Sequence, residues 1–176
     1  MQKLKDKKRI IILGCSGSGK STLSKELGAL LNINVTHLDK LYYKPNWIEE
    51  DKEVFKNKQL EIIAEDAWII DGNYRKTLDL RLQRCDLVIY LDYNKLTSMH
   101  GVLKRYRQYK HKQRDTIATG CFEKLDKSFL RWVWRFKKDA KPLIMEMIAK
   151  YDHYDYLVFK NRRALNKWLE NEKQNY

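Results

Sequence analysis

One glycine-rich segment constrains the fold of this chain more than any other feature. The sequence GCSGSGKS at residues 14–21 matches the pattern G-x-x-x-x-G-K-[ST]. It follows the apolar run IIIL at residues 10–13, which is typical of a strand buried on both faces. It precedes a segment whose leucines have helical spacing. A strand, a glycine-rich turn and a helix in this order predict a loop that binds phosphate groups, the P-loop.

Each residue type in this loop has a physical role. Gly14, Gly17 and Gly19 let the backbone turn so that N–H groups point at phosphate oxygens, and the next helix adds its positive N-terminus. Lys20 is expected to reach the β- and γ-phosphates, and the Ser21 hydroxyl to bind Mg²⁺. We therefore expect ATP and Mg²⁺ as ligands. The predicted nucleotide-binding residues of the loop are Gly14, Cys15, Ser16, Gly17, Ser18, Gly19, Lys20, Ser21 and Thr22.

The order of apolar runs along the chain predicts an α/β fold. Short strands are expected at residues 10–13, 35–38, 68–70, 87–91 and 156–159. Helical spacing separates them at residues 21–31, 51–65 and 95–109, in a long stretch interrupted at Pro142, and at 162–170. Residues 39–47 are expected to form a polar and aromatic loop. This alternation predicts a three-layer domain with a five-stranded parallel sheet and helices on both faces. With roughly 150 residues per domain, residues 1–176 are expected to form a single domain.

Composition limits the partners and the location. The chain has 36 Lys+Arg against 23 Asp+Glu, and this excess attracts anions without choosing among nucleotides, nucleic acids and phosphorylated surfaces. No apolar window approaches the roughly 20 residues of a membrane span. The apolar run after the basic start is shorter than the about 7 to 15 residues of a signal peptide. Cys15, Cys85 and Cys121 have no disulfide or zinc spacing, so we expect reduced thiols in a cytoplasmic protein.

Acidic residues follow three of the expected strands. Because ligands bind at the carboxyl ends of parallel strands, Asp39, Asp71 and Asp92 are candidate site residues. We expect Asp71 and Asp92 to orient Mg²⁺ or its waters, although either could instead cap a helix or form a turn. Asp39 is expected to hydrogen-bond to, or take a proton from, an acceptor hydroxyl; it could also be an ordinary loop residue.

Several segments together resemble a known family. WIIDGNYRKTLDLRL is similar to a segment of nucleoside monophosphate kinases, with Asp71, Gly72 and Arg75 in register. With HLDKLYYKPNW, CDLVIYLDYNK, GCFEKLDKSFLRWVWRF and the P-loop, it resembles the bacterial DNA topology modulation proteins, which belong to the adenylate-kinase-like P-loop NTPases. The resemblance covers nearly the whole chain. It implies the strand order 2-3-1-4-5, a small helical lid at about residues 110–126, and transfer of the ATP γ-phosphoryl group to a small-molecule or nucleotide acceptor.

The resemblance also implies roles for further residues. An acid after the second strand is similar to shikimate and gluconate kinases, whose acceptors bear hydroxyls. Lid arginines of such kinases close over the phosphates, which makes Arg105, Arg107 and Arg114 candidates beside Lys20 and Asp39 for catalysis. Arg162 is expected to stack on the adenine. The predicted acceptor-binding residues are Asp39, Tyr43, Trp47, Asp71, Gly72, Asn73, Arg75 and Arg81.

Two alternatives stay open at this level. The basic segment at residues 104–114 is interleaved with Tyr106 and Tyr109, so it could be a solvated surface or a nucleic-acid patch of a nucleotide-dependent DNA-binding regulator. The face formed by Phe129, Trp132, Val133 and Phe136 predicts a core stripe, with an acceptor pocket or dimer contact as alternatives. The oligomeric state is not determined by the sequence.

Overall fold

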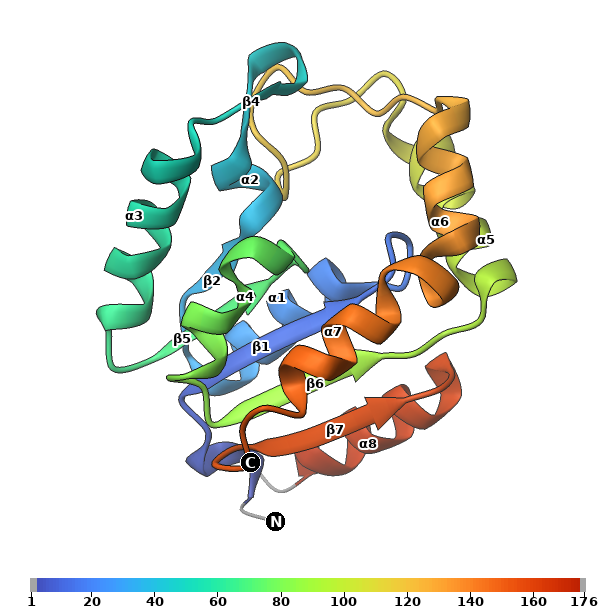
Figure 1. The fold of residues 1–176 in the computed structure, drawn as a ribbon. Coiled ribbons are helices and arrows are strands. Elements are labelled where there is room, and N and C mark those ends of the chain that lie inside the picture. Colours follow the sequence, from blue (N-terminus) through green and yellow to red (C-terminus); the bar gives the residue numbers. More distant parts are fainter. Residues whose placement is uncertain (1–2, 175–176) are drawn as a thin grey trace.

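A parallel five-stranded sheet forms the centre of the molecule (Figure 1). The computed structural model describes residues 3–174. The strands of this sheet are β1 (Arg9–Gly14), β2 (Val35–His37), β5 (Trp68–Asp71), β6 (Leu87–Leu91) and β7 (Asp155–Phe159). Their order is β2-β5-β1-β6-β7, and all the pairings are parallel. Counted in chain order, this is the arrangement 2-3-1-4-5, so the predicted fold class is confirmed.

The central strand β1 is apolar on both faces because both are covered. Residues 10–13 of this strand have no exposed surface. Ile11 and Leu13 belong to the core on one face of the sheet, whereas Ile10 and Ile12 belong to the core on the other. This alternation follows from the two-residue period of a strand. It places Gly14, the last residue of β1, at the carboxyl edge of the sheet.

Helices cover both faces and produce the three layers. On one face, α1 (Lys20–Leu31) and α8 (Arg162–Gln174) bury Leu27 and Leu165. The other face is covered by α3 (Lys52–Ala64), α4 (Arg75–Leu82), α6 (Lys127–Asp139) and α7 (Lys141–Ile148). The remaining long helix, α5 (Lys95–Tyr109), runs beside α6 beyond the carboxyl edge of the sheet (Figure 1). A short helix η1 (Leu4–Asp6) precedes β1. None of the helices within residues 3–174 is long and apolar enough to cross a membrane.

The structure differs from the sequence-based expectation in three segments. Leu38, expected to end the second strand, begins α2 (Leu38–Tyr42), and the expected loop at residues 39–47 contains the rest of this helix and η2 (Pro45–Trp47). The hairpin formed by β3 (Tyr43–Lys44) and β4 (Ile48–Glu49) encloses η2. A helix was not expected at α4, whose sequence RKTLDLRL is rich in charge. Such short elements depend on tertiary contacts more than on periodicity, which explains why the pattern missed them.

The third difference concerns the segment at residues 110–126, called here the roof segment. It was expected to be a small helical lid, but it is irregular between α5 and α6. Gly120 has φ +82°, a left-handed conformation that interrupts any regular helix. Backbone and side-chain hydrogen bonds to the hairpin, described below, replace those of a helix.

Arg81 supports the loop that follows β5. Its side chain has no exposed surface, and its Nη atoms donate hydrogen bonds to the carbonyls of residues 72, 73 and 74 at 2.9, 2.8 and 3.2 Å. Arg81 does not line the cleft described below, so its expected role in acceptor binding is replaced by a structural one. The buried guanidinium is accommodated here because three carbonyl groups accept hydrogen bonds from its two Nη atoms.

Replacing this side chain should destabilise the fold. We expect Arg81→Ala to lower the free energy of unfolding by about 3 kcal/mol, because three carbonyls lose a charged donor and a cavity remains. Urea denaturation measures the change. The matched control Arg84→Ala, at an exposed position, should change it by less than about 0.5 kcal/mol. Equal effects of the two substitutions would contradict the structural role of Arg81.

Candidate active site

The P-loop forms one end of a deep cleft at the carboxyl edge of the sheet. Gly14, Gly17 and Gly19 have φ values of +142°, +78° and +95°, which side chains with a Cβ rarely adopt. Residues Ser16, Gly17, Gly19, Lys20, Ser21 and Thr22 line the cleft, which has a volume of about 950 Å³. Gly14, Cys15 and Ser18 are buried and do not line the cleft. The structure thus separates the predicted nucleotide-binding set into residues facing the cleft and residues that support them.

Lys20 brings a positive charge to this end of the cleft. Its Nζ donates a hydrogen bond to the Cys15 carbonyl at 3.1 Å. Burial lowers the pKa of Lys20, and the negative charges of Asp71 and Asp39 partly oppose that effect. A partly desolvated cation beside two acids gains strongly from a polyphosphate, because the anion provides compensating charge that water cannot.

Asp71 and Ser21 are suited to hold Mg²⁺ with a nucleotide. Asp71 Oδ2 accepts a hydrogen bond from Ser24 Oγ at 3.0 Å and lies 3.0 Å from His37 Nδ1. Burial alone would raise the pKa of Asp71, but His37, the charge of Lys20 and the Ser21 hydroxyl together bring it below its usual value. Within residues 3–174 there is no cluster of three or more His, Cys, Asp or Glu side chains that could hold a metal alone. This donor set fits Mg²⁺, which is usually bound through one or two carboxylates with waters and phosphates.

Asp92 does not join this group. It lies 3.2 Å from the Lys137 ammonium and 2.8 Å from that of Lys141, and it does not line the cleft. These two lysines come from α6 and α7, so Asp92 connects the end of β6 to the junction of the two helices. The expectation of a magnesium ligand at Asp92 is therefore corrected, because the helix junction covers this strand end.

The loop after β5 fixes the P-loop. Asn73 Nδ2 donates to the Gly14 carbonyl at 3.0 Å, and the Gly14 amide donates to Asn73 Oδ1 at 3.1 Å. Gly72 has φ +126° and faces Leu38, whose Cβ would lie 2.9 Å from an added Cβ. Gly72 and Asn73 both line the cleft. Arg75 is exposed at the start of α4 and does not line it, so its expected contact with an acceptor is not formed.

Asp39 belongs to α2 and lines the cleft. Its Oδ1 accepts a hydrogen bond of 2.8 Å from the Tyr74 hydroxyl. Burial and then the charge of Asp39 raise the pKa of Tyr74, so the tyrosine remains a donor to the carboxylate. Tyr43 and Trp47 line the same part of the cleft, with ring centroids 5.1 Å apart. Asp39, Tyr43 and Trp47 are thus brought together as expected from the sequence, whereas Tyr74 was missed.

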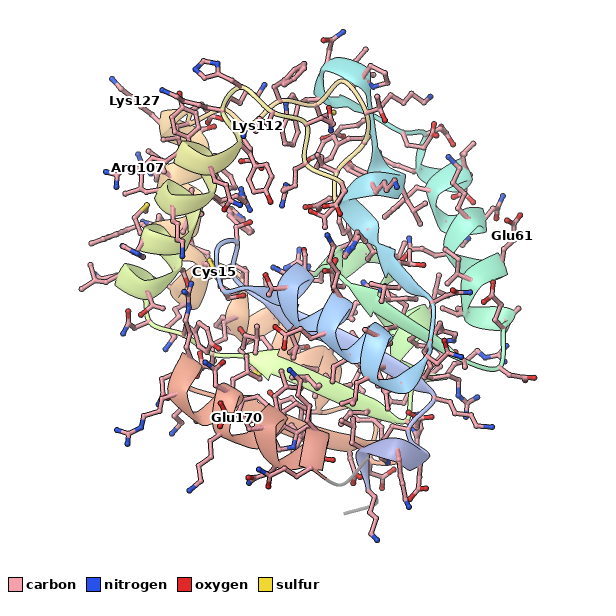
Figure 2. The ribbon with its side chains drawn as sticks, turned by 180° about the vertical axis from the view of Figure 1, so that it is seen from behind. Cys15, Glu61, Arg107, Lys112, Lys127 and Glu170 are labelled. Atoms are coloured by element: carbon pink, nitrogen blue, oxygen red, sulfur yellow. The ribbon has the colours of Figure 1, made fainter. Side chains whose placement is uncertain are left out.

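Two of the three candidate lid arginines reach the cleft. Arg105 and Arg114 line it, and both contact the carboxylate of Glu123. Arg107 is exposed, and Figure 2 shows it on the outer side of α5, away from the cleft. It lies two residues from Arg105 on a helix, a spacing that directs the two side chains to different faces. Arg162 lines the cleft with Nη2 3.4 Å from the Gly17 carbonyl, at the P-loop end where a nucleotide is expected.

The roof segment passes from α5 and α6 to the hairpin across the top of the view in Figure 1, and it contributes Arg114 and Glu123 to the cleft lining. The Asn46 amide donates to the Gly120 carbonyl at 3.2 Å, and Trp47 Nε1 donates to the Phe122 carbonyl at 2.9 Å. Ile117, Ala118 and Cys121 pack against Tyr43 and Trp47. The hairpin next to Asp39 and the segment that carries Arg114 therefore form one continuous wall.

A contact between two glycines joins the P-loop to α5. A Cβ added at Gly101 would lie 2.0 Å from the Gly17 carbonyl oxygen, and one added at Gly17 would lie 2.2 Å from the Ser98 carbonyl oxygen. Only residues without a Cβ allow this approach of backbone to backbone. The contact places Arg105, one turn further along α5, above the phosphate-binding end of the cleft.

The α6 face divides between core and cleft. Val133 and Phe136 are buried, whereas Phe129 and Trp132 line the cleft with ring centroids 6.1 Å apart. Cys15 packs against this helix, with its Sγ 3.8 Å from the Val133 carbonyl oxygen. Both the core and the pocket interpretations of the apolar stripe therefore hold, each for different residues.

Comparisons with known proteins agree with this architecture. A family model described as an AAA domain matches residues 10–76, which include the P-loop, Asp39 and Asp71. No curated protein matches the sequence significantly.

Solved structures of two kinds of kinase are similar to this chain. The shikimate kinase of Acinetobacter baumannii, in complex with shikimate, is 16% identical with a TM-score of 0.57, covering 96% of this chain and 92% of that chain. The shikimate kinase of Bacteroides thetaiotaomicron is 17% identical with a TM-score of 0.56, covering 96% of this chain and 96% of that chain. A gluconokinase of Sinorhizobium meliloti 1021 is 11% identical with a TM-score of 0.52, covering 98% of this chain and 92% of that chain. The chain therefore has the P-loop kinase fold.

The contact between α5 and the P-loop can be tested by the sign of the stability change in Gly101→Ala. In an open helix, Gly→Ala stabilises by about 1 kcal/mol. Gly101→Ala should instead lower the free energy of unfolding by about 1 kcal/mol or more, because the new Cβ meets backbone. It should also weaken MgADP binding. Chemical denaturation and calorimetric titration measure the two effects, and Leu103→Ala on the same helix is the control. A gain in stability for Gly101→Ala would show that the close contact is not formed.

Proposed function

We propose that the chain is an ATP-dependent kinase that transfers the γ-phosphoryl group to a hydroxyl of a small molecule. One observation carries this proposal: a single cleft contains the phosphate cradle with Lys20, the Asp39 carboxylate and two arginines. A nucleotide-binding switch needs the cradle alone. The additional acid and the aromatic wall formed by Tyr43 and Trp47 indicate a second ligand beside the nucleotide.

The nucleotide would occupy the P-loop end of the cleft. Backbone amides of the loop and the N-terminus of α1 would bind its phosphates, and Lys20 would exchange the Cys15 carbonyl for phosphate oxygens. Ser21 and Asp71 would hold Mg²⁺, which supplies charge neutralisation between the β- and γ-phosphates when it is bound. Arg162, next to Gly17, would lie near the base or the sugar.

Asp39 would prepare the acceptor. The Tyr74 hydroxyl fixes one carboxylate oxygen of Asp39. The other oxygen can accept the proton of the attacking hydroxyl as the new bond from oxygen to the γ-phosphorus forms. The bond between the γ-phosphorus and the bridging oxygen breaks, and ADP leaves with that oxygen. Arg105 and Arg114 would stabilise the charge on the transferred group.

The roof segment would act as the lid of this kinase. Its hydrogen bonds to the hairpin enclose the reacting groups, which excludes water as a competing acceptor. The likeness to shikimate kinases and a gluconokinase supports the acceptor class, since both names denote kinases of hydroxyl-bearing molecules. The resemblance to the DNA topology modulation proteins supports a site of the same kinase type.

Activity measurements test the proposal. The purified protein with MgATP and a panel of hydroxyl acceptors, nucleosides and nucleotides should consume ATP stoichiometrically with one acceptor class. Lys20→Ala should lose MgATP binding, and Asp39→Asn should lower kcat by about 10²-fold or more at unchanged affinity for MgATP. The control Asp152→Asn, exposed and away from the cleft, should match the wild type. MgATP binding by Lys20→Ala with wild-type affinity would contradict the cradle assignment, and a wild-type kcat for Asp39→Asn would contradict the role of Asp39.

A second candidate function is nucleotide-dependent binding of DNA. Exposed cations outside the cleft favour it: Arg107, Lys112 and Lys127 lie around the upper ends of α5 and α6 in Figure 2. Such a surface would bind phosphates without sequence specificity, and its affinity would fall steeply with salt. Reversing the charge of Arg107 and Lys112 should then abolish binding of a labelled duplex at about 50 mM salt. Unchanged binding by this double variant, or no binding by the wild type, would remove this candidate.

A further inference from the structure

A buried carboxylate joins the two arginines of the cleft. Glu123, in the roof segment, is only 8% exposed. Its Oε2 accepts a hydrogen bond of 3.1 Å from Arg105 Nε, and its Oε1 lies 3.1 Å from Arg114 Nε. Arg105 comes from the last turns of α5, whereas Arg114 comes from the roof segment. One acid therefore connects the end of α5 to the roof segment.

The geometry leaves the outer parts of both guanidinium groups available. Each arginine contacts Glu123 through Nε, and within residues 3–174 neither has another hydrogen-bond acceptor. The four terminal NH₂ groups of the pair are thus left for a ligand in the cleft that both side chains line. Planar groups with several fixed donors suit a phosphate group with several oxygens.

Both arginines line the cleft, and charged groups at its phosphate end interact with them electrostatically. The charge of Arg105 lowers the pKa of Lys20, after the larger effect of burial. Burial and then Arg105 lower the pKa of Arg114, while Glu123, Asp39 and Asp71 oppose this effect. The pair therefore lies within electrostatic reach of the P-loop lysine, the proposed acceptor base and the proposed magnesium ligand. A γ-phosphoryl group passing from nucleotide to acceptor would cross this region.

Glu123 has a specific effect on such a pair. Two guanidinium groups held close together repel each other, and a shared carboxylate between them removes this repulsion. It also accepts a hydrogen bond from Arg105 Nε and forms an ion pair with Arg114, and these contacts limit the movement of both guanidinium groups. Phe129 lies near the face of the Arg105 guanidinium, with its centroid 6.0 Å from Cζ, and limits movement in that direction.

We infer that Glu123 is a positioning residue that holds Arg105 and Arg114 as a fork for the terminal phosphate of a bound nucleoside triphosphate. The fork gives the closed cleft its preference for a triphosphate over a diphosphate. The inference rests on the proposed function, because it requires a nucleotide in the P-loop. It goes beyond that function by assigning a role to the acid that holds the two arginines.

Binding measurements without any acceptor test this role. Calorimetric titration would give the Kd of MgADP and of a magnesium complex of the β,γ-imido analogue of ATP, for the wild type and for Glu123→Gln. The wild type should bind the triphosphate analogue more tightly than MgADP. In Glu123→Gln this ratio should fall by about tenfold, through weaker binding of the analogue at nearly unchanged affinity for MgADP. Glu123→Asp should restore part of the ratio, because it keeps the charge with a shorter reach.

The controls separate positioning from general stability. Glu61→Gln, on the outer face of α3 and pointing away from the cleft in Figure 2, should leave the ratio unchanged. A purely structural role of Glu123 would weaken both nucleotides equally, and that result overturns the inference. If Glu123→Gln does not fold, Arg105→Lys tests the fork itself, because lysine keeps the charge but lacks the planar guanidinium and its two terminal NH₂ groups. An unchanged ratio in this variant would overturn the inference. If the wild type binds neither nucleotide, the proposed function itself fails, whereas wild-type binding with an unchanged ratio in Glu123→Gln defeats only the role of Glu123.

Discussion

The conformation of the P-loop backbone is the constraint on which the site depends. The loop is held from three directions. Asn73 forms two hydrogen bonds with Gly14, α5 packs on Gly17 through Gly101, and Arg162 reaches the Gly17 carbonyl. Each support belongs to a different strand end or helix. The buried Arg81, which holds the loop bearing Asn73, extends this support into the core. A cradle fixed in this way needs little rearrangement to bind phosphate, which keeps the entropy cost of binding low.

The cations of the cleft are each placed close to acidic side chains. Lys20 is set among Asp71 and Asp39, and Arg105 and Arg114 share Glu123. Each cation is therefore partly neutralised in the folded protein, and each retains capacity for an anionic ligand. The roof segment completes the enclosure because its backbone bonds to the hairpin next to Asp39. A ligand bound at the hairpin and a ligand bound at the arginines would thus contact the same continuous wall of the cleft.

Sequence reasoning succeeded where a short pattern fixes a backbone conformation or a burial pattern. The P-loop, the five strands and the cleft positions of Asp39 and Asp71 agree with it, whereas the strand order and the cleft positions of Arg105 and Arg114 agree with what the family resemblance implied. It placed Asp92, Arg75 and Arg107 at the site because they share strand ends or a basic run with true cleft residues. The structure directs Asp92 to two lysines and leaves the other two exposed. His37 and Tyr74, at strand ends, could have been found by the same rule; Glu123 could not.

The sequence by itself determined the phosphate cradle and the parallel sheet, because glycine spacing and alternating apolar runs act locally along the chain. Only the tertiary structure decided which polar residues meet. Glu123 pairs with Arg105 and Arg114, and Asp39 with Tyr74, across separations that no local pattern encodes. The irregular roof likewise takes its shape from hydrogen bonds to the hairpin, which exist only once both segments are in place. The partners of a buried charge are set by packing, and packing is a property of the whole fold.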